Sequence, residues 1–226
     1  GDYDVDGISS TSLLIDVLND LEAEVDFYIP NRLEEGYGMN QKAIEEIHSR
    51  GADLVITVDC GISAIAEIDL ANDLEIDVIV TDHHTVPEEL PQALTIINPK
   101  QEACAYPFKE LAGVGLAFKL VQALFQKMKG ISDNYKLIRY ISLVTLGTIA
   151  DMVPLVGENR IIVKSGLERI NSSTGYDDFN IGFLKDKVGY ANKDITSGQI
   201  GYYLTPCINA AGRLGQAELG VNMFTA

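Results

Sequence analysis

Acidic residues and histidines occur at four separate places in the chain, each at the end of a predicted strand or of an apolar stretch. The places are the segment Asp2-Tyr3-Asp4-Val5-Asp6-Gly7, Asp59, the segment Asp82-His83-His84, and Asp151. Carboxylate oxygens combined with one or two imidazoles suit Mn²⁺ or Mg²⁺ better than an ion that prefers thiolates. The four places therefore predict a divalent-metal site, provided that the fold brings them together.

Each place taken alone also has an ordinary structural interpretation. The first segment could be a turn that caps a helix, or a weak match to a calcium-binding loop. Asp59 could cap a loop, and the adjacent His83 and His84 point in different directions. Asp151 differs from these, because a carboxylate in apolar sequence is costly unless it is paired. Agreement among four separate segments favours one shared site over four coincidences.

The elements that must position these residues follow from the hydrophobic pattern. Short apolar runs alternate with amphipathic stretches in the first half, which predicts βαβ units and an α/β fold. Predicted strands cover residues 25–29, 54–58, 77–81 and 94–97. Predicted helices cover residues 9–21, 40–50, 63–74, 114–129, 135–152 and 159–170. Right-handed crossovers then give a doubly wound, mostly parallel sheet with helices on both faces, and ligands bind at its carboxyl edge.

The two ends of the chain predict further structure around this sheet. Gly1 leads directly into a segment that resembles the loop after a strand, so we expect an apolar strand upstream. Residues 1–170 are predicted to form the domain that carries the site. Residues 171–226 are predicted to be a helical and irregular connector towards a second domain, with a loop at residues 205–215.

The composition bounds the class of protein. The chain has 33 Asp or Glu and 17 Lys or Arg, so its formal net charge is −16. This charge disfavours a nucleic-acid binder that relies on a basic surface, although carboxylates that hold cations cease to count as negative. No apolar run has the length of a membrane span, and no signal peptide is visible. The three cysteines form no CxxC pair, which fits a reducing, cytoplasmic compartment.

Several motifs together resemble those of a known family. DYDVDG, VDCG, TDHH and GTIADMVPL occur in the order found in the DHH phosphoesterase superfamily. The segments at residues 30–38, 111–120 and 208–215 are similar to those of the RecJ-type exonucleases within it. The resemblance covers essentially the whole chain. It implies a metal-dependent 5′→3′ exonuclease that hydrolyses single-stranded DNA to 5′-mononucleotides in recombination and repair, with residues 1–170 as the catalytic domain.

The resemblance also implies roles for individual residues around two Mn²⁺ or Mg²⁺ ions. The implied metal ligands are Asp2, Asp4, Asp6, Asp59, His83 and Asp151, and the implied catalytic residues are Asp4, Asp6, Asp59, His83, His84 and Asp151. Asp59 is the best candidate to bridge the ions, and Asp82 is expected to hold an imidazole through a hydrogen bond. Asn209, Arg213 and Arg32 are the implied substrate-binding residues. A water shared by the ions would then attack the phosphorus in line.

Other residues and other functions remain open at this point. Tyr37, Tyr202 and Tyr203 are candidates for stacking on bases or for core and turn roles. The chain could instead be a related phosphodiesterase that acts on oligonucleotides, cyclic dinucleotides or pyrophosphate, or a replication scaffold that has lost its metal site. The presence of every motif acid and both histidines argues against the scaffold. Single-strand-binding protein or a helicase are possible partners, and we expect a monomer with no membrane contact.

Overall fold

The computed structural model describes residues 1–128, 134–172 and 179–226 of the chain. The strands are β1 (Leu54–Val58), β2 (Asp77–Thr81) and β3 (Thr95–Ile97). The first helices are α1 (Val5–Asp20), α2 (Gln41–Ser49), α3 (Ile65–Asp73) and α4 (Gly113–Lys127). The later helices are α5 (Asn134–Arg139), α6 (Ile141–Ala150), α7 (Gly157–Ser172), α8 (Ile181–Lys187), α9 (Ser197–Gln199), the π-helical turn η1 (Ile200–Leu204), α10 (Thr205–Arg213) and α11 (Glu218–Thr225). Residue 129, the predicted end of the fourth helix, lies outside the described residues.

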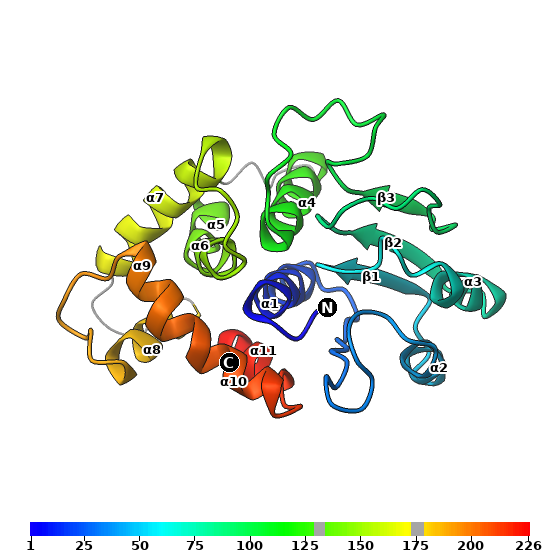
Figure 1. Ribbon diagram of the computed structural model, residues 1–226, viewed down its shortest axis with the longest axis horizontal. Helices are drawn as coiled ribbons and strands as arrows, with labels where there is room; N and C mark the ends of the chain where they lie inside the picture. The colour runs from blue at the N-terminus through cyan, green and yellow to red at the C-terminus, as the bar shows by residue number, and fades with distance from the viewer. Residues whose placement is uncertain (129–133, 173–178) are drawn as a thin grey trace.

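The three strands form a parallel sheet in the order β1-β2-β3, with Ile56 opposite Ile79 in the first pair and Val80 opposite Ile96 in the second. Helices α1 and α4 lie on one side of the sheet, and α2 and α3 lie on the other (Figure 1). Runs of β-branched residues suit strands that helices cover on both faces. The predicted parallel sheet with helices on both faces is therefore confirmed.

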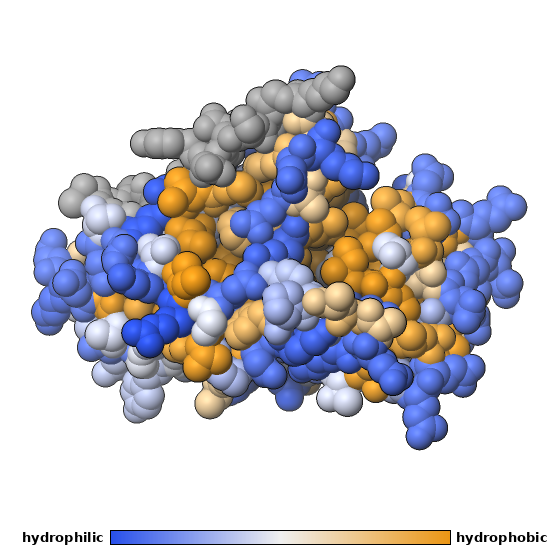
Figure 2. Space-filling view, turned by 90° about the horizontal axis from the view of Figure 1, so that it is seen from above, coloured by the Kyte–Doolittle hydropathy of each residue, from blue (hydrophilic) through white to orange (hydrophobic). Residues whose placement is uncertain are grey.

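The surface is mainly hydrophilic at the two ends of the molecule. Figure 2 shows hydrophilic side chains at both ends of one face and patches of hydrophobic side chains between them. Exposed apolar residues occur along the segment from α6 to α7, where Met152 is 88% exposed and Ile161 is 66% exposed. In the part of the chain that the structure describes, no helix is long and apolar enough to cross a membrane.

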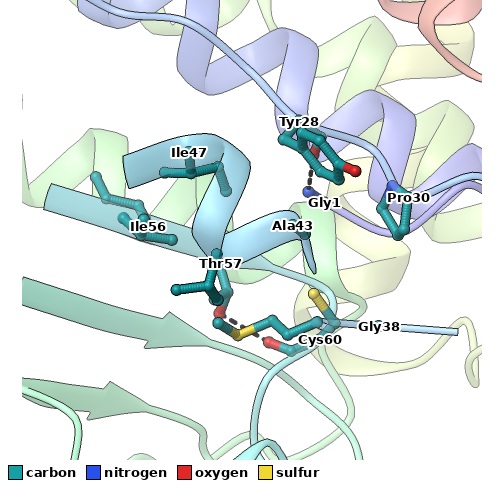
Figure 3. Close-up of a pocket in the computed structure, with 12 residues that line it drawn as sticks. Gly1, Tyr28, Pro30, Gly38, Ala43, Ile47, Ile56, Thr57 and Cys60 are labelled. Carbon is teal, nitrogen blue, oxygen red and sulfur yellow. Dashed lines mark hydrogen bonds between the residues drawn. The ribbon is translucent and has the colours of Figure 1, made fainter. Parts of the chain in front are cut away.

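The predicted strand at residues 25–29 is wrong. Figure 3 shows this segment near a small cavity of about 50 Å³ between α2 and β1, with Ala43 and Ile56 in its lining. The Tyr28 carbonyl accepts a hydrogen bond from the Gly1 amino group (2.8 Å), as the figure shows, and no described strand pairs with the segment. A strand exists only where a neighbour supplies the ladder of hydrogen bonds, so an apolar alternating pattern is not sufficient.

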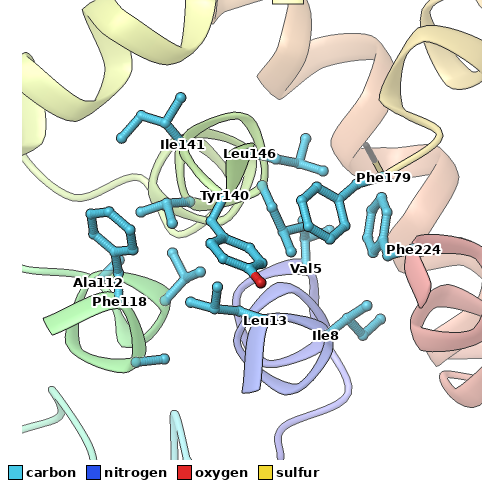
Figure 4. Close-up of a cluster of buried hydrophobic side chains, with 14 of the residues drawn as sticks. Val5, Ile8, Leu13, Ala112, Phe118, Tyr140, Ile141, Leu146, Phe179 and Phe224 are labelled. Atoms are coloured by element: carbon cyan, nitrogen blue, oxygen red, sulfur yellow. The ribbon is translucent and has the colours of Figure 1, made fainter. Parts of the chain in front are cut away.

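The main hydrophobic core lies between α1, α4 and α6 and reaches α11. Figure 4 shows Leu13 of α1, Phe118 of α4 and Leu146 of α6 around the buried ring of Tyr140. The Tyr140 hydroxyl donates a hydrogen bond to Asp16 Oδ2 (2.6 Å), which satisfies the one polar group of this ring. This packing fixes the start of α1 and the end of α6, where acidic residues of the predicted site lie.

Two helix boundaries differ from the prediction. The first helix begins at Val5 rather than at residue 9, because the Asp4 carboxylate caps it: Asp4 Oδ1 accepts hydrogen bonds from the amides of Asp6 (2.8 Å) and Gly7 (3.0 Å). The predicted helix at residues 135–152 is divided into α5 and α6 at Tyr140. The other predicted helices are confirmed to within a few residues.

The predicted loop at residues 205–215 is also wrong, because most of it is helix α10, continuous with α9 and η1. Ile208 and Gly212 form a buried face of this helix. A Cβ atom at Gly212 would collide with the Tyr3 carbonyl oxygen, so glycine lets the helix approach the first site segment closely. Tertiary packing here overrides the low helix propensity of glycine.

The packing of α7 against α6 is tight enough to test. A Cβ atom at Gly166 would lie 2.8 Å from the Ile141 carbonyl oxygen and would collide with the Thr145 side chain. We expect Gly166→Ala to lower the free energy of unfolding by about 1–3 kcal/mol, measured by urea denaturation. The matched control is Gly198→Ala in the exposed helix α9, where a Cβ atom would lie 4.0 Å from the Thr196 hydroxyl. The control should be neutral or stabilising, and equal effects of the two substitutions would contradict this description of the interface.

Candidate metal centre

Four side chains from distant parts of the chain converge at the carboxyl edge of the sheet. His83 Nε2 lies 3.0 Å from Asp59 Oδ1, 3.6 Å from Asp151 Oδ2 and 3.9 Å from Asp6 Oδ2. Asp59 directly follows β1, His83 lies just beyond β2, Asp6 is in the first turn of α1, and Asp151 caps the end of α6. The fold thus brings together one residue from each of the four places.

A second group of carboxylates adjoins the first. Asp2, Asp4 and Asp59 each offer one oxygen within 4.8 Å of the others, and Asp59 also offers one to His83 and His84 at the same spacing. Asp59 is therefore shared between the groups, as a carboxylate that bridges two ions would be. The sequence-based prediction that Asp59 bridges two ions stays a prediction, since the geometry only permits it.

The first group has the donor atoms of a metal site. Asp59 Oδ1, His83 Nε2 and Asp151 Oδ2 are buried and lack a hydrogen-bond partner among the described residues. The 3.0 Å approach of His83 Nε2 to Asp59 Oδ1 is close, but it does not have the geometry of a hydrogen bond. Buried polar atoms are normally satisfied, so three unsatisfied ligand atoms directed at one another fit a divalent cation between them. Carboxylate oxygens with an imidazole nitrogen suit Mn²⁺ or Mg²⁺.

The electrostatics of the site favour the same conclusion. Burial raises the pKa of Asp6 and of Asp59 well above the usual range, and neighbouring carboxylates raise both further. The same two causes raise the pKa of Asp2 and of Asp151 to about 6. Burial lowers the pKa of His83 to about 4, so its imidazole is neutral at neutral pH and can act as a ligand. A bound cation would relieve the repulsion among these carboxylates.

Backbone amides hold Asp6 in place. Asp6 Oδ2 accepts a hydrogen bond from the Gly113 amide (2.7 Å), and Oδ1 accepts one from the Val114 amide (2.9 Å), both at the start of α4. The first amides of a helix lack partners within it and carry a partial positive charge, so they suit a carboxylate. Asp6 is fully buried, and these two bonds fix both of its oxygens.

Two glycines make room for the carboxylates, and sequence reasoning gave Gly147 no such role. A Cβ atom at Gly113 would lie 2.7 Å from Asp59 Cβ, and one at Gly147 would lie 2.8 Å from Asp6 Oδ1. Asp59 itself has a left-handed backbone with φ of 59°, while its amide donates to the Thr81 carbonyl at 3.0 Å. Left-handed backbone at a residue other than glycine is strained and often occurs at functional sites. In the sequence, Gly147 lies one helical turn before Asp151, and this spacing was the signal for its place at the site.

Asp82 lies behind the second histidine. Asp82 Oδ1 is 2.7 Å from His84 Nδ1 and accepts the His84 amide at 3.0 Å, while Oδ2 accepts the Ile62 amide at 2.9 Å. The hydrogen bond to Asp82 raises the pKa of His84 above its usual value. Asp82 thus contacts the imidazole of His84, and its predicted role in support of a metal ligand stays a prediction.

A polar cavity of about 300 Å³ adjoins the candidate metal ligands. Its lining consists of Asp2, Tyr3, Asp4, Arg32, Tyr37, His84, Asn209 and Arg213. Asn209 Oδ1 accepts a hydrogen bond from the Val5 amide (3.1 Å), and the Arg32 guanidinium lies 5.0 Å from the centre of the Tyr3 ring. The predicted substrate-binding residues therefore lie beside the predicted ligands, and every predicted site residue except Asp82, which lies behind His84, is in one of the two groups or lines this cavity.

Tyr37 projects into the same region from a glycine-rich turn. Its hydroxyl lies 3.3 Å from His84 Nε2 and 3.4 Å from the Asp59 carbonyl oxygen. Gly36 and Gly38 on either side have φ of 82° and 78°, which is backbone that favours glycine. The turn therefore presents the Tyr37 ring to the cavity, and the GYG sequence was the signal for it.

Comparisons with known proteins agree with this geometry. The family model described as "DHH family, N-terminal domain" matches residues 1–148. The single-stranded-DNA-specific exonuclease RecJ of Bacillus subtilis is 45% identical over 227 residues, which cover 99% of this chain and 27% of that protein. RecJ of Escherichia coli is 40% identical over 235 residues, which cover 99% of this chain and 40% of that protein. The chain thus spans about a quarter to two fifths of the length of these curated relatives.

Solved structures give the same result. A crystal structure of exonuclease RecJ bound to manganese matches all of this chain and 55% of the solved chain, with a TM-score of 0.84 and 39% identity. RecJ of Thermus thermophilus in complex with Mn²⁺ matches all of this chain and 31% of the solved chain, with a TM-score of 0.81 and 34% identity. The match to the family model, with the convergent acids and histidines, establishes that the chain belongs to the DHH family.

Proposed function

We propose that this chain is the catalytic part of a metal-dependent exonuclease that hydrolyses single-stranded DNA from the 5′ end to 5′-mononucleotides. One observation carries the proposal: buried ligand atoms of Asp59, His83 and Asp151 converge without partners beside a cavity that holds two arginines. The RecJ relatives, which are named single-stranded-DNA-specific exonucleases, support the substrate class.

Two ions, Mn²⁺ or Mg²⁺, would be held by the two groups of ligands. Asp6, His83 and Asp151 would hold one ion, and Asp2 and Asp4 the other, with Asp59 between them. When bound, such ions supply a deprotonated water as nucleophile and stabilise charge on the leaving oxygen. The solved RecJ structures with Mn²⁺ and with Mg²⁺ support this choice of metals.

The chain's own side chains would place the phosphodiester in the cavity. Arg32 and Arg213 are exposed at its wall and can donate to phosphate oxygens. Asn209 is already tied to the start of α1, so it would set the position of α10 relative to the metal ligands. His84 is half-exposed, and its raised pKa suits a group that steadies the charged phosphate or protonates the leaving 3′-oxygen.

The remaining assignments belong to the same proposal. Residues 1–170 would be the catalytic domain and residues 171–226 a connector towards a second domain. The protein would act in recombination and repair in the cytoplasm, as a monomer, with single-strand-binding protein or a helicase as partners. The free state of Cys60, Cys104 and Cys207 supports a reducing compartment.

The first test removes the shared carboxylate. Asp59→Asn keeps the size of the side chain and removes its charge, so we expect Mn²⁺ binding to be lost and hydrolysis of a 5′-phosphorylated single strand to fall by about 100-fold or more. Strands labelled at the 5′ or the 3′ end show the direction of digestion, and a duplex of the same sequence tests strand specificity.

The matched control for this test is Asp73→Asn on the exposed side of α3, which removes the same charge away from the site. It should leave metal binding and hydrolysis unchanged. Full activity of Asp59→Asn, or cleavage of the duplex at the same rate as the single strand, would exclude the proposed nuclease.

The second test follows the pH dependence of metal binding. Without a cation, Asp2 and Asp151 have a pKa of about 6 in the folded chain, above the usual 3.8, so their contribution to stability is present below pH 4 and is lost as the pH rises through about 6. A cation needs these groups ionised, so it restores stability at higher pH. At about 100 times its Kd, Mn²⁺ should stabilise the protein by about 2.7 kcal/mol near pH 8 and far less near pH 5. Equal shifts of Tm at the two pH values would contradict a carboxylate site.

A further inference from the structure

The helix formed by α9, η1 and α10 has a buried face and an exposed face. The exposed face has no partner among the described residues. Ile200, Leu204, Ile208 and Gly212 recur every four residues and are buried. The opposite side carries Tyr202, Pro206, Ala210 and Arg213, which are all exposed, and Tyr202 is 74% exposed. These residues are spaced by three or four, so they form one stripe along the helix.

The stripe lies in a segment that carries little negative charge, although the chain as a whole is acidic. Residues 195–217 contain no Asp or Glu, although the whole chain has 33 of them, and Arg213 is their single charged residue. A polyanion that approaches the candidate metal centre is repelled by acidic surface elsewhere. The helix therefore offers a strand of nucleic acid a path without that repulsion.

The stripe reaches the cavity beside the candidate metal centre through Arg213. Asn209 and Arg213 line that cavity, and Gly212 packs on the Tyr3 carbonyl at the same end of the helix. At the other end, Gly201 faces Ile149 of α6, whose Cγ2 would lie 3.7 Å from a Cβ atom there. In Figure 1 the helix accordingly runs from beside α6, at α9, to the region of α11 below α1.

Tyrosine rings lie together at the N-terminal end of the stripe. Tyr202 and Tyr203 have ring centres 4.9 Å apart in an edge-to-face arrangement, and Tyr203 lies 5.6 Å from Tyr190. Tyr203 and Tyr190 thus support the Tyr202 ring from one side, while the ring itself stays in solvent. A held, exposed ring is a suitable surface for a nucleobase, because every base has a face that stacks regardless of sequence.

We propose that Tyr202 stacks on a base of the single strand, on the part that continues in the 3′ direction from the bond being cleaved. The inference rests on the proposed function, which places the phosphodiester in the cavity by Arg213. Tyr202 precedes Arg213 by eleven residues, or about 16 Å of helical rise. A stacked strand advances about 3.4 Å per nucleotide, so about five nucleotides cover this distance, and fewer do when the strand is extended.

The test compares strands of different length. Binding is measured by fluorescence anisotropy in the Asp59→Asn background, which leaves the DNA intact, with a dinucleotide and with a strand of about 12 nucleotides. Tyr202→Ala should weaken binding of the longer strand by about 5- to 100-fold and leave the dinucleotide unaffected within about twofold. In the active protein, the same substitution should raise KM for the longer strand and leave kcat unchanged.

Two comparisons identify the contact as stacking. Tyr202→Phe keeps the ring and should bind the longer strand within about twofold of the unsubstituted protein. Tyr202→Ala should leave the salt dependence of binding as it is in the unsubstituted protein. Arg213→Ala should reduce the slope of log K against log[salt] by about 0.7–1, because it removes a phosphate contact. A general folding defect would not separate the two substitutions in this way.

The outcomes are distinguishable from those of the nuclease test. If Tyr202→Ala binds the longer strand as the unsubstituted protein does, the inference is wrong, and a lowered Tm in that case would show that the ring stabilises the helix through its packing on Tyr203. If the active protein hydrolyses no single strand with Mn²⁺, the proposed function fails, and the anisotropy arms still decide whether Tyr202 contacts DNA.

Discussion

Carboxylates that are buried close together repel one another, and the arrangement of this molecule depends on containing that repulsion. Asp6 and Asp59 are almost fully inaccessible to water and lie around a neutral imidazole. Burial in a medium of low polarity strengthens the repulsion, so folding brings these groups together at a cost that a divalent cation offsets. The core between α1, α4 and α6 supplies the rigid frame that keeps the ligand atoms together before an ion arrives.

The frame holds the acids mainly through the main chain. Asp4 caps its own helix, Asp82 accepts the amides of Ile62 and His84, and Asp6 accepts two amides of α4. Through each of these bonds, the main chain fixes the orientation of a carboxylate. No flexible cationic side chain is needed for this. Cations such as lysine would also compete with the metal for the same oxygens, so amides, which are neutral donors, are the better support.

Much of the site could be predicted from the sequence because parallel strands bring their carboxyl ends to one edge, which places Asp59 and His83 together. Asp151 was predictable because an unpaired acid in apolar sequence is unfavourable. The strand at residues 25–29 could not be excluded, since pairing depends on a neighbour that local pattern does not reveal. The helix at Thr205–Arg213 was missed because glycine and asparagine indicate loops locally, whereas the close approach of Gly212 to Tyr3 is a tertiary contact.

The pair of amide bonds from α4 to Asp6 has a consequence for how the protein can change over generations. Gly113 and Val114 donate these bonds through main-chain amides, so the bonds depend on where the first turn of α4 lies. Inserting one residue at the start of the helix would, however, rotate its first turn by about 100° and withdraw both donors. Such an insertion would therefore separate Asp6 from its donors without replacing any residue of the site.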